Sequence, residues 1–284
     1  MIDDGQFDAA QRSKAEQIDA AVPNPARVAD FLNGGRNNFD ADRRTAQTML
    51  SLAPAIAAIV PFVLAFHQRA VRYLAHEAGV RQFLDVGTGL PGAATSRDLV
   101  QLVDPACRVV HVDNDPMVLT HLRAFSRSTP PGAFAALEGK ITDPAALLAG
   151  AAETLDFRRP VALLVPSSLP FIPSAVRAAG LVSALTEAFP PGSYVALCHV
   201  ASDLDPAVVA GVDYWNRISA RQFTPRSRAE VAALADGLEL VEPGLVPVSE
   251  WRPDPGQPAR SRPVPVYAAV ARKTEIKSIR IQRL

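Results

Sequence analysis

A glycine-rich turn is the segment of this sequence best suited to ligand chemistry. Residues 83–92 read Phe-Leu-Asp-Val-Gly-Thr-Gly-Leu-Pro-Gly, an apolar run that passes into a turn and then into a helical pattern. Gly87, Gly89 and Gly92 match G-x-G-x-x-G, in which the glycines let the backbone approach a nucleotide-like ligand at a helix N-terminus. Taken alone, the pattern also fits an ordinary turn.

Asp85 separates two cofactor classes that could use this turn. A dinucleotide places its anionic pyrophosphate here, and a nearby carboxylate would repel it. S-adenosylmethionine has no phosphate and carries a positive ammonium and a positive sulfonium group, so a carboxylate at the strand end attracts it. We therefore expect S-adenosylmethionine as the cofactor, bound by Asp85, Gly87, Thr88 and Gly89.

Further polar residues follow two neighbouring apolar runs. Asp113 ends the run 108–113 and could accept hydrogen bonds from both ribose hydroxyls, with Asn114 beside it. Nicotinamide cofactors share this feature, so Asp113 supports an adenosine site without choosing between the cofactors. Thr142 and Asp143 follow a third, less apolar run, and a carboxylate there could accept a hydrogen bond from the adenine amino group.

The segment 33–39, Asn-Gly-Gly-Arg-Asn-Asn-Phe, is a second candidate for cofactor binding. Two glycines beside polar amides suit a backbone that approaches a ligand closely, and Arg36 could meet the methionine carboxylate. The alternative is a plain loop between two helices. The candidate cofactor contacts are Asn33, Gly34, Gly35, Arg36 and Asn38.

The buried run 161–165 is followed by Pro166, Ser167 and Ser168, and the first two are expected beside the transferring methyl group. Methyltransferases that act on nucleic acid bases carry an Asn/Asp-Pro-Pro-aromatic motif at this place, and it is absent here. Lys plus Arg (29) equals Asp plus Glu (29), whereas proteins that grip phosphates usually have a basic excess. Both observations argue against a nucleic acid substrate.

Candidate substrate and catalytic residues are fewer. Of the five histidines, His199 at the end of the run 194–200 is best placed to act as a general base, although a core histidine with a backbone partner is the commoner role. Tyr214 and Trp215, with Phe39 opposite and Ser168 nearby, could wall a substrate pocket, or could be ordinary helix packing. No spacing typical of metal ligands is present.

The elements that must position these residues change character at Gly79. Before it the pattern is helical: one helix capped by Asn24 with Pro25 at its first position, a second from Asp40, and a third that follows Pro61. After it, short apolar runs alternate with helices, which indicates a doubly wound α/β sheet. We expect strands at 82–86, 108–113, 133–137, 161–165 and 194–200, and helices at 93–103, 116–125, 175–189 and within 206–220.

The C-terminal part ends differently. Ser227 and Glu230 form a capping box that opens a helix ending at Gly237. Two β-like runs, 238–248 and 264–271, follow with no helix between them and predict an antiparallel hairpin at one edge of the sheet.

Composition limits the location of the protein. Cys107 and Cys198 fit neither a disulfide framework nor a metal site, and the acidic start Met1-Ile2-Asp3-Asp4 is unlike a signal peptide. The longest apolar run, 53–65, contains two prolines and is expected to be a buried helix and not a membrane span. We therefore expect a cytoplasmic protein with no membrane partner.

With these residues, the chain resembles the class I methyltransferases, and more narrowly an S-adenosyl methyltransferase family found mainly in actinobacteria. The resemblance spans roughly 23–271 and rests on the segments 26–28, 30–39, 42–43, 83–91, 112–116, 237–244 and 251–253. It implies a Rossmann-like, seven-stranded, mostly parallel sheet with a helical element over the cofactor, and no particular substrate. The domains expected are a flexible N-terminus (1–22), an N-terminal helical cap (23–79), the cofactor-binding domain (80–272) and a C-terminal tail (273–284).

Two positions depart from the family pattern. Gly92 replaces the usual Thr or Ser after Leu-Pro, which removes a helix-capping hydroxyl. Pro170, in Ser-Leu-Pro-Phe-Ile-Pro (168–173), stands where relatives usually have His, which puts the substrate side in doubt.

The expected function is methylation of a small molecule, such as a secondary metabolite, with a homodimer as a possible assembly. A non-catalytic cofactor binder is the alternative that Pro170 keeps open. A nicotinamide-dependent oxidoreductase is disfavoured by Asp85 and by the lack of a Tyr-x-x-x-Lys pair.

Overall fold

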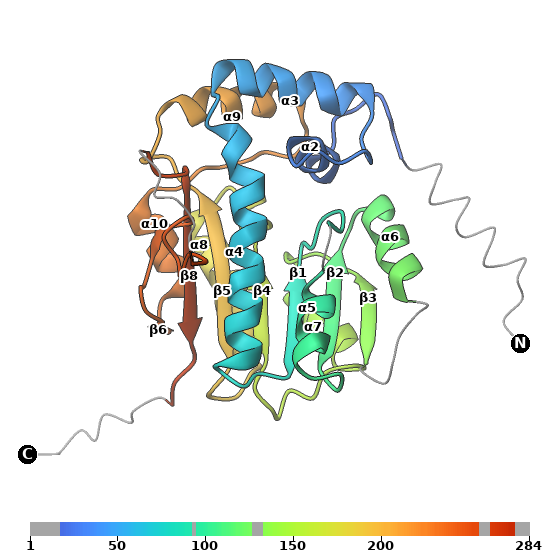
Figure 1. Cartoon of the computed structure of the whole chain (residues 1–284), viewed down its shortest axis with the longest axis vertical. Coiled ribbons are helices and arrows are strands. Elements are labelled where there is room, and N and C mark those ends of the chain that lie inside the picture. The colour runs from blue at the N-terminus through green and yellow to red at the C-terminus, as the bar shows by residue number, and fades with distance from the viewer. Residues whose placement is uncertain (1–17, 93–94, 127–132, 256–261, 276–284) are drawn as a thin grey trace, which may run out of the picture.

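The computed structural model describes residues 18–92, 95–126, 133–255 and 262–275. The expected flexible N-terminus and C-terminal tail lie mostly outside these residues. The described chain contains a mixed sheet with helices on both faces, and a group of helices above one end of the sheet (Figure 1).

Three helices precede the sheet. Helix α2 (Pro25–Leu32) begins as expected, because the Asn24 side chain accepts hydrogen bonds from the backbone N–H groups of Ala26 and Arg27. Helix α3 (Asp40–Leu52) follows, and then α4 (Ile56–His76).

The expectation that the third helix starts after Pro61 is wrong, since Pro61 lies inside α4. The turn before it is retained because Ile56 is buried against α9, where Gly211 leaves room for its side chain. That packing offsets the hydrogen bond that proline cannot donate.

The sheet has the order β3-β2-β1-β4-β5-β8-β6. Its first five strands run parallel: β1 (Gln82–Val86), β2 (Arg108–Asp113), β3 (Phe134–Glu138), β4 (Ala162–Val165) and β5 (Tyr194–Val200). The sequence predicts all five to within one residue at each end. Parallel strands with both faces covered read as continuous apolar runs, which is why they are easy to recognise.

The antiparallel edge is confirmed, with one difference in its arrangement. Strand β8 (Val266–Arg272) pairs with β5 along its whole length, and its other edge pairs with β6 (Glu239–Leu240) and β7 (Val246–Pro247). The first of the two β-like runs is therefore two short strands that share one edge, so the sheet has eight strands in place of the seven that the resemblance implies.

Helices cover both faces of the sheet. The bounds are α5 (Ser96–Val103), α6 (Pro116–Ser126), α7 (Pro144–Ala151), α8 (Ala175–Glu187), α9 (Ala207–Ile218) and α10 (Arg228–Ala232), with 3-10 turns η1 (Leu169–Phe171) and η2 (Ala233–Ala235). Alternate strand residues point to opposite faces, so Phe83 packs with α4 and α5, whereas Leu84 packs with α7 and α8. The expected capping box of Ser227 and Glu230 is present in α10.

The helices above the sheet come from two parts of the chain. In Figure 1, α2, α3 and α9 lie above the carboxyl ends of the parallel strands, and α4 runs from this group down along the sheet. Helix α3 packs against α9, so a helix from the second half of the chain completes the roof. We call α2, α3, α9 and the first turns of α4 the helical roof.

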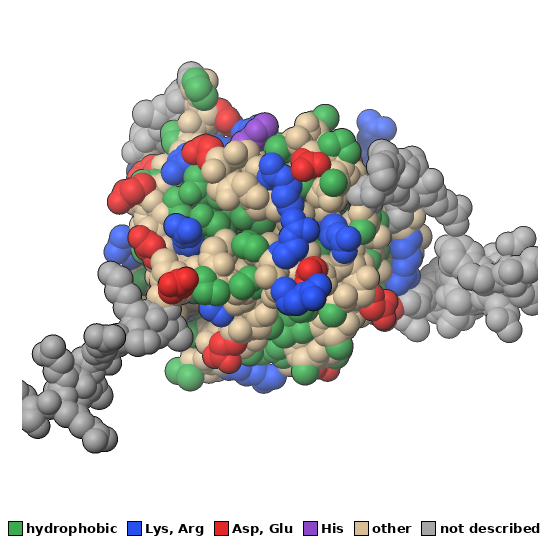
Figure 2. Space-filling view, turned by 90° about the horizontal axis from the view of Figure 1, so that it is seen from below, with side chains coloured by type: hydrophobic (Ala, Val, Ile, Leu, Met, Phe, Trp, Pro, Cys, Tyr) green, Lys and Arg blue, Asp and Glu red, His purple; other side chains and the backbone are tan. Residues whose placement is uncertain are grey.

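The opposite end of the molecule is shown in Figure 2, where basic side chains gather near the middle of the face, among acidic and apolar ones. Ion pairs between neighbouring side chains of the described chain include Arg81 with Asp104 at 3.0 Å and Arg158 with Asp156 at 2.9 Å.

No single helix in the described part of the chain has the length and hydropathy of a membrane span. Helices α3 and α4 meet that test only when they are taken together, across a bend of 108°.

Candidate active site

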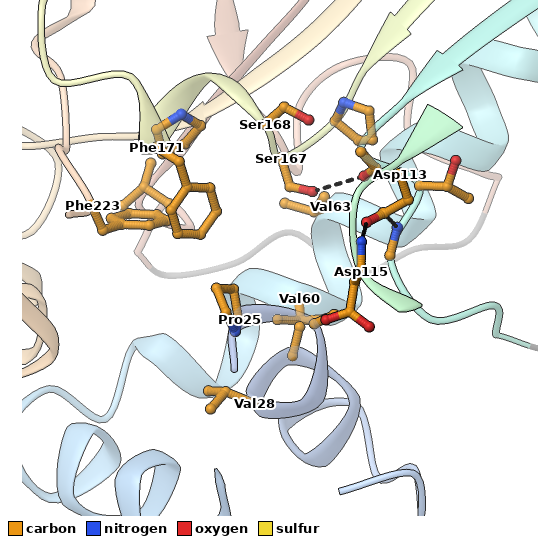
Figure 3. A pocket seen from close by; sticks show the side chains of 18 of the residues that line it. Pro25, Val28, Val60, Val63, Asp113, Asp115, Ser167, Ser168, Phe171 and Phe223 are labelled. Carbon is orange, nitrogen blue, oxygen red and sulfur yellow. Dashed lines mark hydrogen bonds between the residues drawn. The ribbon is translucent and has the colours of Figure 1, made fainter. Parts of the chain in front are cut away.

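A cavity of about 690 Å³ lies between the carboxyl ends of the parallel strands and the helical roof. This volume is within the range of small-molecule sites. Its two ends differ in chemistry: Asp113 and Asp115 lie on one side in Figure 3, whereas Phe171 and Phe223 lie on the other. We call these the polar end and the apolar end.

The glycine turn after β1 forms one wall of the cavity. Gly87 and Gly89 have φ of 76° and 70°, a region that side chains disfavour. A Cβ on Gly87 would lie 1.8 Å from the Ser168 hydroxyl oxygen, which itself donates to the Val86 carbonyl at 2.8 Å. Glycine is therefore required where the loop and the end of β4 meet.

Asp85 lies at the bottom of this turn and is only 1% exposed. Its Oδ2 accepts a hydrogen bond from Ser96 at 2.8 Å and lies 3.5 Å from His67 Nε2 and 3.4 Å from His111 Nδ1. Burial acts to raise the pKa of Asp85, but His67, His111 and Ser96 together outweigh it and hold the pKa below its usual value. The carboxylate is therefore ionised.

The second oxygen of Asp85, Oδ1, is buried and has no hydrogen-bond partner within the described residues. A buried charged oxygen without a partner is costly, and a cationic ligand would satisfy it. Asp85 and His67 both line the cavity, so the Asp85 carboxylate lies in its wall.

Asp113 joins the turn to the end of β2. Its Oδ1 accepts hydrogen bonds from the backbone N–H groups of Asn114 and Asp115, and its Oδ2 accepts one from Gly89 at 3.0 Å. Burial raises the pKa of Asp113, and these backbone donors partly oppose that effect. Oδ2 retains a lone pair for a ligand, and Asp113 and Asn114 both line the cavity; the ribose-binding role stays a prediction.

Asp115 connects this end of the cavity to the helical roof. Its Oδ2 accepts a 2.6 Å hydrogen bond from Asn24 Nδ2, while its Oδ1 caps α6 by accepting from the Met117 and Val118 N–H groups. Asn24 is also the N-cap of α2, so one side chain fixes the roof at the edge of the polar end.

The two adenine candidates lie in different places. Thr142 lines the cavity together with Gly139, Lys140 and Ile141. The Asp143 carboxylate instead accepts a hydrogen bond from Ala146 N and caps α7, and Asp143 is not among the lining residues. Its position favours a capping role.

The Asn-Gly-Gly segment folds around a carboxylate of its own helix. Asp30 Oδ2 accepts hydrogen bonds from Asn37 N at 2.8 Å and from Asn38 Nδ2 at 2.7 Å. A Cβ on Gly35 would lie 2.1 Å from Asp30 Oδ1, which explains that glycine without a ligand. Asn33 lines the cavity, whereas Gly34, Gly35, Arg36 and Asn38 do not.

Only some of the residues expected beside the substrate line the cavity. Pro166, Ser167, Ser168 and Trp215 line the cavity. Phe39 and Tyr214 do not, and their rings lie beside the guanidinium groups of Arg27 at 4.9 Å and Arg217 at 6.0 Å. The structure adds Phe171, Phe223 and His67, which the sequence analysis left out. Phe171 adjoins Pro170 in a motif already singled out, but the approach of His67 to Asp85 leaves no local signal.

His199 lines the cavity, but both of its ring nitrogens have partners. Nδ1 lies 2.9 Å from the Val200 carbonyl and Nε2 faces Arg226 Nη1, so the proton resides on Nδ1 and Nε2 accepts from the guanidinium. Burial lowers the pKa of His199 to about 4. This geometry leaves neither nitrogen free to take a proton from a substrate, and it favours a structural role.

The two departures from the family pattern have local consequences. The hydroxyl cap that Gly92 lacks is supplied by Thr95, which accepts from Asp98 N and forms a capping box at the start of α5. Pro170 lines the cavity within η1, and its carbonyl accepts a hydrogen bond from Thr224 N at 2.8 Å. In the described part of the chain, no group of three or more His, Cys, Asp or Glu side chains could hold a metal ion.

Comparisons with known proteins identify the family of this chain. A family model described as S-adenosyl methyltransferase matches residues 11–274. A crystal structure of a DUF574-family protein from Streptomyces avermitilis has 37% identity and a TM-score of 0.85, covering 90% of this chain and 99% of that one. A candidate methyltransferase from Thermobifida fusca has 33% identity and a TM-score of 0.83, covering 89% and 96%. A search of curated proteins found no match.

The chain belongs to the S-adenosyl methyltransferase family. It is an S-adenosylmethionine-dependent methyltransferase with the class I fold, and the expectations for fold, enzyme class and cofactor are confirmed.

Proposed function

We propose that this enzyme methylates a small molecule that binds inside the cavity, at its apolar end. The observation that carries the proposal is the division of one roofed cavity into a polar and an apolar end (Figure 3). A methyl transfer needs donor and acceptor side by side with water excluded, and a single cavity of this kind provides both conditions.

The residues of the polar end fit the methyl donor. The ionised Asp85 carboxylate in the cavity wall would attract the donor's ammonium group, and Asp113 Oδ2 would accept a hydrogen bond from a ribose hydroxyl. When bound, S-adenosylmethionine supplies a methyl group already activated by its sulfonium. The chain's own contribution is to hold the donor's polar groups at this end.

The rest of the site has the properties needed for alignment. The hydrogen bonds from Ser168 to the Val86 carbonyl and from Ser167 to the Gly87 carbonyl fix the end of β4 against the glycine turn. The roof covers this junction, and Asn24 holds the roof to Asp115. A nucleic acid base would have to pass beneath the roof to reach it, which supports a small-molecule acceptor.

A methyl-transfer screen tests this proposal. The protein is incubated with S-adenosylmethionine labelled in its methyl group and with panels of phenols, indoles and amines, and label in extracted small molecules is counted. We expect transfer that depends on the protein and is lost in Asp85→Asn. Asp143→Asn, whose carboxyl caps a helix outside the cavity, is the matched control. Transfer to RNA, DNA or protein in parallel reactions, with none to the panels, would contradict the proposal.

A further inference from the structure

Three aromatic side chains meet at the apolar end of the cavity. Phe171 belongs to η1, Trp215 to α9 and Phe223 to the loop after α9. The Phe171 and Phe223 rings are perpendicular, with an interplanar angle of 84° and centroids 5.1 Å apart, and both pack in the apolar cluster that includes Trp215. We call these three residues the aromatic corner; Figure 3 shows its two phenylalanines across the cavity from Asp113.

The backbone that carries Phe171 is fixed by a buried cation. Arg226 is 1% exposed, and its guanidinium donates to the carbonyls of Leu169 and Ile172, one on either side of the η1 residues Pro170 and Phe171. The same guanidinium donates to His199 Nε2. Arg226 and His199 are therefore positioning residues for Phe171.

Phe223 and Trp215 are held in a similar way. The Phe223 N–H donates to Asn216 Oδ1 at 2.7 Å, and Asn216 Nδ2 donates back to the Phe223 carbonyl at 2.9 Å. The Trp215 indole N–H donates to the Arg221 carbonyl at 2.7 Å. The corner is thus formed before any ligand arrives, so little ordering is needed on binding.

Two ionisable side chains in the wall near the corner already make hydrogen bonds within the protein. Asp30 accepts two on Oδ2 from Asn37 and Asn38 of its own loop, and His199 accepts one from Arg226. Arg221 lines the cavity, but its side chain is exposed and so lies at the rim. The remaining wall of this end is apolar and includes Val28, Leu32 and Met49. A charged ligand body would be desolvated here without compensation.

We propose that the aromatic corner is the acceptor subsite and that it binds a flat, uncharged aromatic ring. Two perpendicular phenylalanines offer one ring face and one ring edge, which suits stacking and edge-to-face contact with a planar π-system. A saturated molecule of the same size would bury equal area but lose those contacts. This inference rests on the proposed function, since it assigns the substrate class of the same cavity.

Equilibrium binding tests the assignment without requiring turnover. The protein is saturated with S-adenosylhomocysteine and titrated with 2-naphthol, a flat aromatic probe, or with decahydro-2-naphthol, its saturated counterpart. We expect 2-naphthol to bind about 10-fold more tightly than the saturated probe, because two aromatic contacts are gained. Equal affinities, or no 2-naphthol binding at millimolar concentration, would overturn the proposal.

Variants locate the effect at the corner. Phe223→Leu and, independently, Phe171→Leu should each weaken 2-naphthol binding about 5-fold and leave the saturated probe within about 2-fold. Tyr214→Leu, which changes an aromatic residue of α9 outside the cavity, should leave both probes unchanged. Unchanged 2-naphthol affinity in both phenylalanine variants would also overturn the assignment. If S-adenosylhomocysteine binds but 2-naphthol does not, the aromatic class fails alone; if neither binds, the cavity is not the methyltransfer site.

Discussion

Two glycine turns in this molecule have similar sequences but different structural roles. The turn at 87–89 follows β1, and its backbone lines the cavity beneath the roof. The turn at 34–35 follows α2 and closes around the Asp30 carboxylate, and neither of its glycines lines the cavity. In each turn, one position must be glycine because a Cβ there would overlap a neighbouring side-chain oxygen. That oxygen is Ser168 Oγ for Gly87 and Asp30 Oδ1 for Gly35.

The difference lies in the carboxylate next to each turn. Asp30 also lines the cavity, but its Oδ2 accepts two hydrogen bonds, from Asn37 and Asn38 of its own loop. Asp85 lines the cavity, its carboxylate makes no hydrogen bond with its own turn, and its buried oxygen Oδ1 has no hydrogen-bond partner in the described chain. A glycine turn therefore indicates a ligand site only where its polar neighbours are left unsatisfied.

The largest expected effect comes from neutralising the two carboxylates in turn. Asp85→Asn should weaken binding of S-adenosylmethionine by about 10- to 100-fold, because a charge-assisted hydrogen bond is worth roughly 1.5–3 kcal/mol. Asp30→Asn should leave this affinity within about 2-fold and lower the free energy of unfolding by ~1–2 kcal/mol. Calorimetric titration and urea denaturation of both variants measure the two quantities.

Circular dichroism of Asp85→Asn is the control, since Asp85 also contacts His67 and His111. Equal losses of donor affinity in the two variants would remove the distinction between the turns. It would mean that the Asn-Gly-Gly segment contacts the cofactor, as the sequence analysis expects.

A smaller effect is expected from adding one methyl group to each turn. Gly87→Ala brings a Cβ against Ser168 at a φ of 76°, so the loop must shift; the strain is at least ~1 kcal/mol, and a donor affinity lower by about 3- to 10-fold is expected. Gly35→Ala displaces Asp30 and should lower the melting temperature with little change in affinity. Calorimetry and thermal denaturation separate the two outcomes.

Gly87→Ala combined with Ser168→Ala is the matched test of the cause. Removing the hydroxyl relieves the contact but not the unfavourable φ, so part of the lost affinity should return. No recovery at all would show that backbone strain alone governs this position.

The parallel strands and the polar end of the cavity could be predicted from the sequence because their signals are local. Buried strands give apolar runs, and Asp85 and Asp113 lie at or beside the ends of two of them. Pro61 was misleading, because the packing of Ile56 against Gly211 keeps the helix continuous through the proline.

The apolar end could not be predicted, because it is assembled by contacts between distant segments. Phe171 and Phe223 come from different segments, and Arg226 bridges η1 to His199 at the end of β5. His67 reaches Asp85 only because α4 runs down along the sheet. Phe39 and Tyr214, predicted to wall a substrate pocket, lie outside the cavity lining, and their rings lie beside Arg27 and Arg217.

The smallest effect is expected at the third glycine of the cofactor turn. Gly92→Ser restores the residue type that relatives usually carry, and among the described residues no atom lies within 4 Å of a Cβ placed there. Because Thr95 already caps α5, the added hydroxyl has no vacant helix end to satisfy, and stability should change by less than ~0.5 kcal/mol. Thr95→Ala should cost about 1 kcal/mol by urea denaturation, since the cap itself is lost. If Gly92→Ser instead restored the stability lost in Thr95→Ala, α5 could be capped from either position. The glycine at position 92 would then mean only that this chain uses one of two equivalent caps.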